Sequence, residues 1–265
     1  MKIPIYQVDA FANHIFKGNP AAVCPLNSWL PDETLQQIAS ENNLSETAFF
    51  VMEKAGYHIR WFTPKAEVDL CGHATLASAY VLFRFLNYED SVIIFKSKSG
   101  PLSVCTDGEL ITLNFPETPI VPCAAPEEIV TAFGDALVEV WKTDDYMVVL
   151  NSEKKLVDLV PDSNLLAKLD CRGIAVTAKG VNVDFVSRFF APRHGIDEDP
   201  VTGSSHCYLT PYWSNQLNKN QLTAKQLSKR SGDLKCERII EHGVPRILIS
   251  GKAALYLRGE INVSG

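Results

Sequence analysis

Two polar loops, each leading into an apolar run, carry residues that could bind and polarise a small molecule. One reads Asp69-Leu70-Cys71-Gly72-His73-Ala74-Thr75-Leu76, and the other reads Asp199-Pro200-Val201-Thr202-Gly203-Ser204-Ser205-His206. A glycine ahead of a helix lets backbone N–H groups approach a ligand, and the first helical turn offers unpaired donors at the positive end of the dipole. Each loop is therefore suited to hold an anion, and the pair predicts one site between two similar halves.

Glu46 is the candidate for proton transfer. It stands in Leu44-Ser45-Glu46-Thr47-Ala48-Phe49-Phe50-Val51, where a polar start runs into a predicted strand whose phenylalanines are expected in the core. Moving a proton between carbons needs a base near the C–H bond and an acid near the receiving atom. A carboxyl group at the edge of a core can serve as both if burial favours its neutral form. The alternative is an acid that caps a helix or ends a strand.

The residues around the two glycines leave several roles open. His73 follows Gly72 at a predicted helix start, where burial and the dipole disfavour the cation and leave a neutral imidazole that can donate to a substrate, unless the ring is purely structural. Asp199 can cap the second helix, contact a substrate, or do both. Ser204 lacks the GxSxG turn of a serine hydrolase nucleophile, so contact with an anion is favoured.

The seven cysteines form no CxxC pair, and an odd number leaves at least one thiol unpaired. We expect reduced, mostly buried thiols, with Cys71 among them. The set of Cys71, His73, His206 and Cys207 does not have the spacing of the usual zinc motifs, so no metal site is predicted.

The elements that must position these residues fall into two similar series. The first predicts strands at 5–11, 20–25, 44–51, 57–63, 92–96, 102–106 and 110–115, a helix from Pro31 to about Asn42, and a buried helix at 74–85. The second predicts a short helix at 126–133, strands near 137–142, 146–150, 172–178 and 182–190, a helix from about Ser205, and strands near 235–241, 245–250 and 255–263.

A short stretch of sequence similarity between the halves supports this repetition. Arg60-Trp61-Phe62-Thr63-Pro64 parallels Arg188-Phe189-Phe190-Ala191-Pro192, and each is followed by an acid, a glycine and a helix. The segment from Pro116 to Pro126 holds four prolines, so we place the domain boundary there, with domains at 1–117 and 118–265.

Composition limits the classes of partner. The chain has 265 residues, 46% of them hydrophobic, and a formal net charge of −6, with no cluster of Lys and Arg that would neutralise phosphates, so nucleic acid is not expected as a partner. The longest apolar stretch, 70–86, includes His73 and Arg84 and is too short and too polar to span a bilayer, so no membrane association is expected. The N-terminus lacks a signal-peptide pattern, and we expect a cytoplasmic protein.

Taken together, these motifs resemble the PhzF-like isomerase family, which is named for a phenazine-biosynthesis enzyme and related in fold to diaminopimelate epimerase. The matching pieces are Val8-Asp9-Ala10-Phe11, Gly18-Asn19-Pro20-Ala21-Ala22-Val23, Asn43-Leu44-Ser45-Glu46-Thr47-Ala48-Phe49, Gly72-His73-Ala74-Thr75 and Asp199-Pro200-Val201-Thr202-Gly203-Ser204. They follow the family's order from near the start of the chain to beyond residue 204.

The resemblance implies an α/β (α+β) fold of two pseudo-symmetric domains, each a curved, barrel-like sheet around a central helix, with the active site in the cleft between them. It also implies that residues 252–265 return to the first domain. It implies proton chemistry without a cofactor on a small carboxylated substrate, and a homodimer by analogy.

By the same resemblance, Glu46 would transfer the proton, and His73, Asp199 and Ser204 would help to bind and polarise the substrate. Gly72 would supply a backbone contact, and Gly203 and Asn19, the latter also a predicted turn residue, are further candidate contacts, which completes the predicted site.

Two other functions stay open. Related epimerases and proline racemases use two facing cysteines, but the second loop has Pro200, Val201 and Thr202 where a thiol would be needed, and Cys207 falls inside the predicted helix. A two-thiol racemase is therefore disfavoured. The alternative from another class is a small-molecule binding protein that kept the fold and lost the chemistry. The sequence favours an isomerase with no cofactor and no metal.

Overall fold

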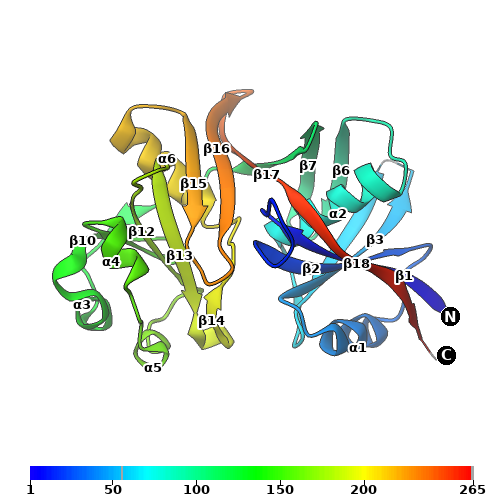
Figure 1. The fold of residues 1–265 in the computed structure, drawn as a ribbon, viewed down its shortest axis with the longest axis horizontal. Coiled ribbons are helices and arrows are strands. Elements are labelled where there is room, and N and C mark those ends of the chain that lie inside the picture. The colour runs from blue at the N-terminus through cyan, green and yellow to red at the C-terminus, as the bar shows by residue number, and fades with distance from the viewer. Residues whose placement is uncertain (55, 264–265) are drawn as a thin grey trace. The chain divides into compact units, whose positions relative to one another are not determined.

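The structure, a computed structural model, describes residues 1–54 and 56–263 and divides into two compact units (Figure 1). Unit 1 contains Met1–Asn114 and the C-terminal segment from Ser250, and unit 2 contains Phe115–Ile249. The sequence analysis places the boundary between residues 117 and 118. In the structure the division falls between 114 and 115, within the last residues of strand β8 (Leu110–Pro116).

Unit 1 is built on one mixed sheet with two helices. Its strands are β1 (Lys2–Ala10), β2 (Asn19–Leu26), β3 (Glu46–Glu53), β4 (Gly56–Phe62), β5 (Glu67–Val68), β6 (Val92–Ser97), β7 (Gly100–Asp107), β8 (Leu110–Pro116) and β18 (Ala253–Asn262), and its helices are α1 (Asp32–Asn42) and α2 (Gly72–Phe85). The main strands pair in the order β18-β1-β2-β3-β4-β6-β7-β8, with β2–β3 and β4–β6 parallel and the others antiparallel.

Helix α2 is the centre of unit 1. It is buried from Gly72 to Ala79, and it packs on β1, β2, β3 and β18. An α-helix that is apolar nearly all round is stable only when it is enclosed, as predicted from the sequence. Helix α1 packs on β3 and β4 through Leu35, Ile38 and Ala39, in a core cluster with Phe49 and Phe62.

The end of the chain completes unit 1. Strand β18 pairs antiparallel with β1 from Lys2 opposite Asn262 to Ala10 opposite Ala253. Strand β1 therefore has neighbours on both sides, β18 and β2, which satisfies its backbone hydrogen bonds.

Unit 2 contains the remaining elements. Its strands are β9 (Val121–Pro122), β10 (Leu137–Lys142), β11 (Tyr146–Leu150), β12 (Ile174–Lys179), β13 (Phe185–Ala191), β14 (Ile196–Asp199), β15 (Gln221–Gln226), β16 (Gly232–Glu241) and β17 (Val244–Gly251), the last of which runs on into unit 1. Its helices are α3 (Glu127–Phe133), α4 (Glu153–Val157), α5 (Ser163–Leu166) and α6 (His206–Leu217), with short 3-10 turns η1 (Gly134–Ala136) and η2 (Pro192–His194).

The two units repeat one strand order. In unit 1, β1-β2-β3-β4-β6-β7 pair as antiparallel, parallel, antiparallel, parallel and antiparallel. In unit 2, β10-β11-β12-β13-β15-β16 pair in the same sequence of directions. Helix α6, buried from His206 to Ser214, takes the place of α2. The repetition predicted from the sequence is therefore present in the pairing of the strands.

Several short elements escaped the sequence analysis. Strands β5, β14 and β15 and helices α4 and α5 were not predicted, because they are only two to six residues long. The Asp107-Gly108 turn does join β7 and β8, with Gly108 at a φ of 60°.

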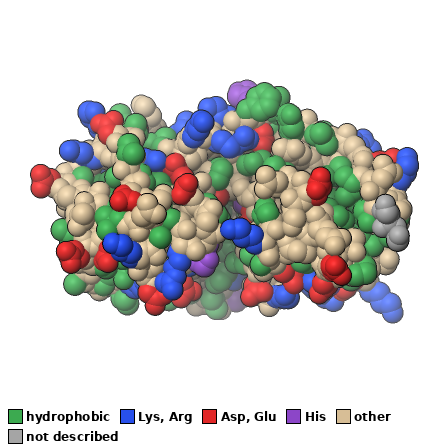
Figure 2. All heavy atoms as spheres, turned by 90° about the horizontal axis from the view of Figure 1, so that it is seen from below, with side chains coloured by type: hydrophobic (Ala, Val, Ile, Leu, Met, Phe, Trp, Pro, Cys, Tyr) green, Lys and Arg blue, Asp and Glu red, His purple; other side chains and the backbone are tan. Residues whose placement is uncertain are grey.

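The surface shows mixed charge. On the face drawn in Figure 2, Lys and Arg side chains are interspersed with Asp and Glu. Within residues 1–54 and 56–263, none of the helices has the length and apolar character needed to cross a membrane.

Candidate active site

Glu46 is the first residue of β3, an inner strand of the unit 1 sheet. It pairs with Ala21 of the parallel strand β2, and the strand that follows it is buried from Thr47 to Val51. Its side chain is 15% exposed. The carboxyl group thus lies where the polar loop enters the core, as the sequence indicates.

The imidazole of His73 contacts this carboxylate. It is the second residue of α2, and its Nε2 atom lies 3.1 Å from Oε2 of Glu46, with the imidazole side chain only 6% exposed. The two atoms are at ion-pair distance, but neither has an aligned hydrogen-bond partner among the described residues. Buried polar atoms are usually hydrogen-bonded, so unused capacity at this place is a reason to expect a ligand.

Cys71 approaches the same ring from its other side. It is the residue before α2, and its Sγ atom lies 3.6 Å from Nδ1 of His73. The imidazole therefore has a thiol at one nitrogen and a carboxylate at the other. Burial, with a further contribution from Glu46, raises the pKa of the Cys71 thiol to about 11, so the sulfur carries its proton at neutral pH.

The protonation of His73 differs from the sequence-based expectation. Burial acts against the imidazolium, as expected, but the groups at Cys71 and Glu46 outweigh it and hold the pKa of His73 well above its usual range. The pKa of His73 is therefore shifted in the direction opposite to that expected from burial and the helix dipole. The causes are the groups at Cys71 and Glu46 beside the ring, whose contacts with His73 the sequence does not reveal.

The same three side chains are of types that bind transition metals. One ligand atom from each of Glu46, Cys71 and His73 lies within 4.8 Å of the others. However, an imidazole binds a metal ion through one nitrogen, whereas here the thiol and the carboxylate face different nitrogens. The thiol and the carboxylate are therefore placed at opposite nitrogens of the ring and do not share one of them.

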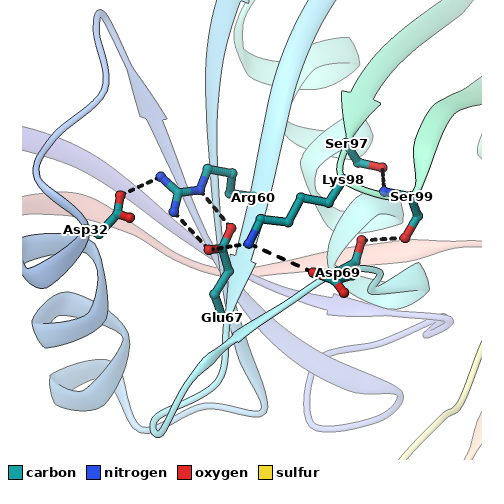
Figure 3. Close-up of polar contacts among 7 residues, drawn as sticks. All are labelled: Asp32, Arg60, Glu67, Asp69, Ser97, Lys98 and Ser99. Atoms are coloured by element: carbon teal, nitrogen blue, oxygen red, sulfur yellow. Dashed lines mark hydrogen bonds and ion pairs between the residues drawn. The ribbon is translucent and has the colours of Figure 1, made fainter.

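The segment that leads into α2 is held by charged side chains (Figure 3). Arg60 donates from Nε and Nη2 to the two oxygens of Glu67, at 2.8 and 2.9 Å. Lys98 donates to the same carboxylate at 2.7 Å, and the Ser99 hydroxyl donates to the backbone carbonyl of Asp69 at 2.9 Å. These contacts fix residues 67–69, directly ahead of Cys71. The Arg60 guanidinium, with Lys98, lowers the pKa of Glu67 to about 2.

In unit 2, Asp199 ends β14 and belongs to a polar turn. Its carboxylate accepts a hydrogen bond from the Thr202 hydroxyl. Gln226 of β15 closes the turn, because its side-chain amide donates to the Asp199 carbonyl at 2.8 Å and its oxygen accepts from the Thr202 N–H at 2.8 Å. Helix α6 starts only at His206 and has no side-chain cap, so the capping role considered for Asp199 is wrong.

Ser204 is held by an ion pair whose carboxylate is buried. Its Oγ accepts a hydrogen bond from Nη1 of Arg172 at 3.1 Å. The rest of that guanidinium binds Asp145, with Nε 3.0 Å from Oδ1 and Nη2 against Oδ2. The hydroxyl of Tyr208, on α6, also donates to Asp145 at 2.7 Å. Asp145 is 1% exposed. Because a guanidinium only donates, the Ser204 proton is left to bind another acceptor.

The two echoed arginines make the same contacts in their own units. Arg60 binds Glu67 through two nitrogens and lies 5.1 Å from the Phe62 ring centroid. Arg188 binds Glu198 in the same way, at 2.7 and 3.0 Å, and lies 5.0 Å from the Phe190 ring centroid. Each arginine therefore fixes the strand that precedes the glycine-containing turn of its unit.

The remaining predicted residues also have definite places. Gly72 is the first residue of α2, and Gly203 lies in the turn just before α6. Asn19 is not a turn residue, because it opens β2 opposite Ala10 and is completely buried. It stands two positions before Ala21, the partner of Glu46, and so lies at the same end of the parallel strands β2 and β3.

The zinc set considered from the sequence is divided between the units. Cys71 and His73 belong to unit 1, whereas His206 and Cys207 belong to α6 of unit 2. The Nδ1 atom of His206 donates to the Thr202 carbonyl at 2.8 Å, and burial lowers the pKa of this ring to about 4. His206 is thus a buried neutral histidine that closes the turn at the start of α6.

Arg172, Asp145 and Gln226 were missed by the sequence analysis. Arg172 falls at the start of a predicted strand, at 172–178, and the strand in fact starts at Ile174, so the arginine stands ahead of the sheet. An arginine that precedes an apolar strand, with an Asp-Asp pair before the parallel strand next to it, was the available signal. Gln226 could not be identified as part of the turn, because strand β15, which carries it, was not predicted.

Comparisons with known proteins agree with this architecture. Residues 8–259 match the PhzC-PhzF family, described as phenazine biosynthesis-like protein. A protein of Pseudomonas aeruginosa named an uncharacterized isomerase is 52% identical over 263 residues, which are 99% of this chain and 100% of that protein.

Solved structures show the same fold. The crystal structure of a phenazine biosynthesis protein of the PhzF family from Enterococcus faecalis has a TM-score of 0.95 at 46% identity and covers 99% of this chain and 100% of its own. A hydroxyproline epimerase from Agrobacterium vitis has a TM-score of 0.63 at 9% identity, covers 98% of this chain and 92% of its own, and bears on the fold alone. The predicted fold class, including its likeness to epimerases, is confirmed.

Proposed function

The chain belongs to the PhzC-PhzF family of phenazine biosynthesis-like proteins, and from that premise we propose that it is an isomerase that moves a proton within a small carboxylated substrate. Glu46 takes the proton from one carbon and returns it to another, and no cofactor takes part. The observation that carries the proposal is the buried contact of 3.1 Å between Glu46 Oε2 and His73 Nε2.

The chemistry of proton transfer fits these groups. A carboxylate at the edge of the core can alternate between base and acid within one turnover, which a 1,3-shift or an epimerisation requires. The negative charge that develops on the substrate needs fixed positive groups nearby. His73, whose pKa is raised, and the unpaired N–H groups in the first turn of α2 supply them.

A two-step experiment tests the proposal. A panel of small cyclic and unsaturated carboxylates is first screened by thermal shift, because a specific ligand stabilises the folded protein. Each ligand found is then incubated with the protein in D₂O, and deuterium incorporation is followed by NMR. Glu46→Gln is expected to fold normally and to slow incorporation on the order of 10²–10⁴-fold.

The matched control is Glu53→Gln at the other end of the same strand. Glu53 is ion-paired with Lys96 at 2.9 Å and is more exposed, so its loss leaves exchange unchanged. Normal exchange by Glu46→Gln would remove Glu46 from its role. A ligand that binds tightly and takes up no deuterium with the wild-type protein would identify a binding protein instead of an enzyme.

The other assigned roles need their own variants. Asp199→Asn and Ser204→Ala test separately whether the turn ahead of α6 takes part in turnover. Exchange after exhaustive dialysis against EDTA tests the absence of a metal requirement, because proton transfer by side chains alone survives this treatment.

A further inference from the structure

The proposed proton transfer does not use the sulfur atom of Cys71, although this atom contacts His73. Cys71 is buried, and its Sγ lies 3.6 Å from Nδ1 of the ring. The opposite nitrogen, Nε2, lies 3.1 Å from Glu46. The described titratable groups that act on His73 are these two, one from the loop ahead of α2 and one from β3.

The carboxylate favours a proton on the ring nitrogen that faces it. An imidazole nitrogen without a proton is an acceptor, and so is each carboxylate oxygen, so a bare Nε2 atom at 3.1 Å from ionised Glu46 would bring two acceptors together. A proton on Nε2 turns the same contact into an attraction. When the ring is neutral, Nδ1 is then the bare nitrogen and needs a donor.

A thiol can form a hydrogen bond with Nδ1 in both charge states of the ring. When His73 is neutral, the S–H group of Cys71 donates to bare Nδ1. When His73 is a cation, Nδ1–H donates to the sulfur, which is a weak acceptor. A methyl group at this place could do neither and would leave a buried nitrogen without a partner, which costs about 1–3 kcal/mol.

We propose that Cys71 is a positioning residue: its thiol pairs with Nδ1 of His73 and thereby keeps the ring proton on Nε2, facing Glu46, whether His73 is charged or neutral. This inference deepens the proposed function, on which its catalytic meaning rests. It gives the carboxylate a constant N–H neighbour while protons enter and leave the site. The raised pKa of the thiol is consistent with a sulfur that keeps its own proton.

The test is the tautomer of His73 in the free protein, measured by ¹⁵N NMR of the histidine rings during a titration from pH 6 to pH 10. The His73→Gln variant identifies the signals of His73. In the wild-type protein, the neutral ring is expected to carry its proton on Nε2. Cys71→Ser, which keeps a group that donates and accepts, retains this tautomer. Cys71→Ala yields a mixture of tautomers.

Cys24→Ala is the control for a structural effect. Cys24 is a buried thiol of β2 in the core cluster beside α1, so its loss leaves the signals of His73 unchanged. A proton on Nδ1 in the wild-type protein would overturn the inference, and so would an unaltered tautomer in Cys71→Ala. If Cys71→Ala does not fold, the wild-type protein and Cys71→Ser still decide between these outcomes.

The measurement needs no substrate. Its failure therefore leaves the role of Glu46 standing, and the failure of Glu46→Gln to slow deuterium exchange leaves the tautomer result standing. The two proposals can be refuted separately.

Discussion

Replacing Arg172 by Met tests the buried network that holds Ser204. Asp145 is 1% exposed and receives two guanidinium nitrogens and the Tyr208 hydroxyl. Removing one partner of a buried ion pair typically costs about 3–5 kcal/mol, because an unpaired charge stays behind. The Arg172 side chain itself is 47% exposed, so water reaches part of the vacated space. We therefore expect the free energy of unfolding of unit 2 to fall by about 2–3 kcal/mol.

The assay is native-state hydrogen exchange in urea, followed on peptides from α6 and β12. It reports the free energy of opening of unit 2 without assuming that both units unfold together. Arg193→Met is the matched control. Arg193 pairs with Asp170 on the surface, where the two side chains are 49% and 97% exposed, so its loss is expected to change stability by less than about 1 kcal/mol.

A double variant separates charge from packing. Adding Asp145→Asn to Arg172→Met removes the unpaired charge, so the double variant is expected to be more stable than Arg172→Met alone. A loss for Arg172→Met no larger than that for Arg193→Met would refute the reasoning. It would show that the guanidinium does not stabilise the carboxylate that lies beneath it.

Two further predictions concern unit 1. The pKa of Glu67 is lowered from about 4.5 to about 2, so its ion pair adds stability above the ordinary pKa that is lost as the pH falls from about 5 to 2. At pH 7 the free energy of unfolding of the wild-type protein should exceed that of Glu67→Gln by up to about 3 kcal/mol. Urea unfolding at falling pH should show this difference shrink. A constant difference would contradict the assignment. Gly18→Ala should destabilise unit 1 by more than about 2 kcal/mol, because φ is 64° and an added Cβ would lie 2.1 Å from the Ala10 carbonyl oxygen. Gly108→Ala, with a φ of 60° and open space around it, should cost about 1 kcal/mol. Thermal unfolding of the two variants measures both losses, and equal losses would contradict the steric argument.

The repeated architecture could be predicted because its signals are local. Alternating apolar residues mark most of the strands, and the apolar helix at 74–85 marks the centre of unit 1. The Asp107-Gly108 turn marks one hairpin. Strands β5 and β14, of two and four residues, bind an arginine of the neighbouring strand through Glu67 and Glu198, and such ion pairs leave no periodic pattern in the sequence.

The candidate site was predictable only in part, because contacts across the sheet are not encoded by spacing. Glu46 and His73 were named from their motifs, and the structure places them 3.1 Å apart. The charge state of His73 could not be predicted, since it depends on that contact. Arg172 was overlooked because its partner Asp145 lies 27 positions earlier in the chain.

The start of the second parallel strand differs in its chemistry between the two units. In unit 1 the leading end of the second parallel strand carries Glu46, and this acid contacts His73, the residue after the glycine. In unit 2 the strand registers align Gly173 with Glu46, and the residue before it, Arg172, donates to Ser204, again the residue after the glycine. The two units therefore present an acid with an imidazole in one case and a guanidinium with a hydroxyl in the other. A carboxylate can exchange a proton at neutral pH, whereas a guanidinium cannot, so of the two pairs only the first has a group suited to the proposed proton transfer. The second pair is suited to binding and orientation, so under the proposed function Arg172→Lys, which keeps the charge but loses the planar fork of donors, is expected to weaken ligand binding more than it slows the exchange step.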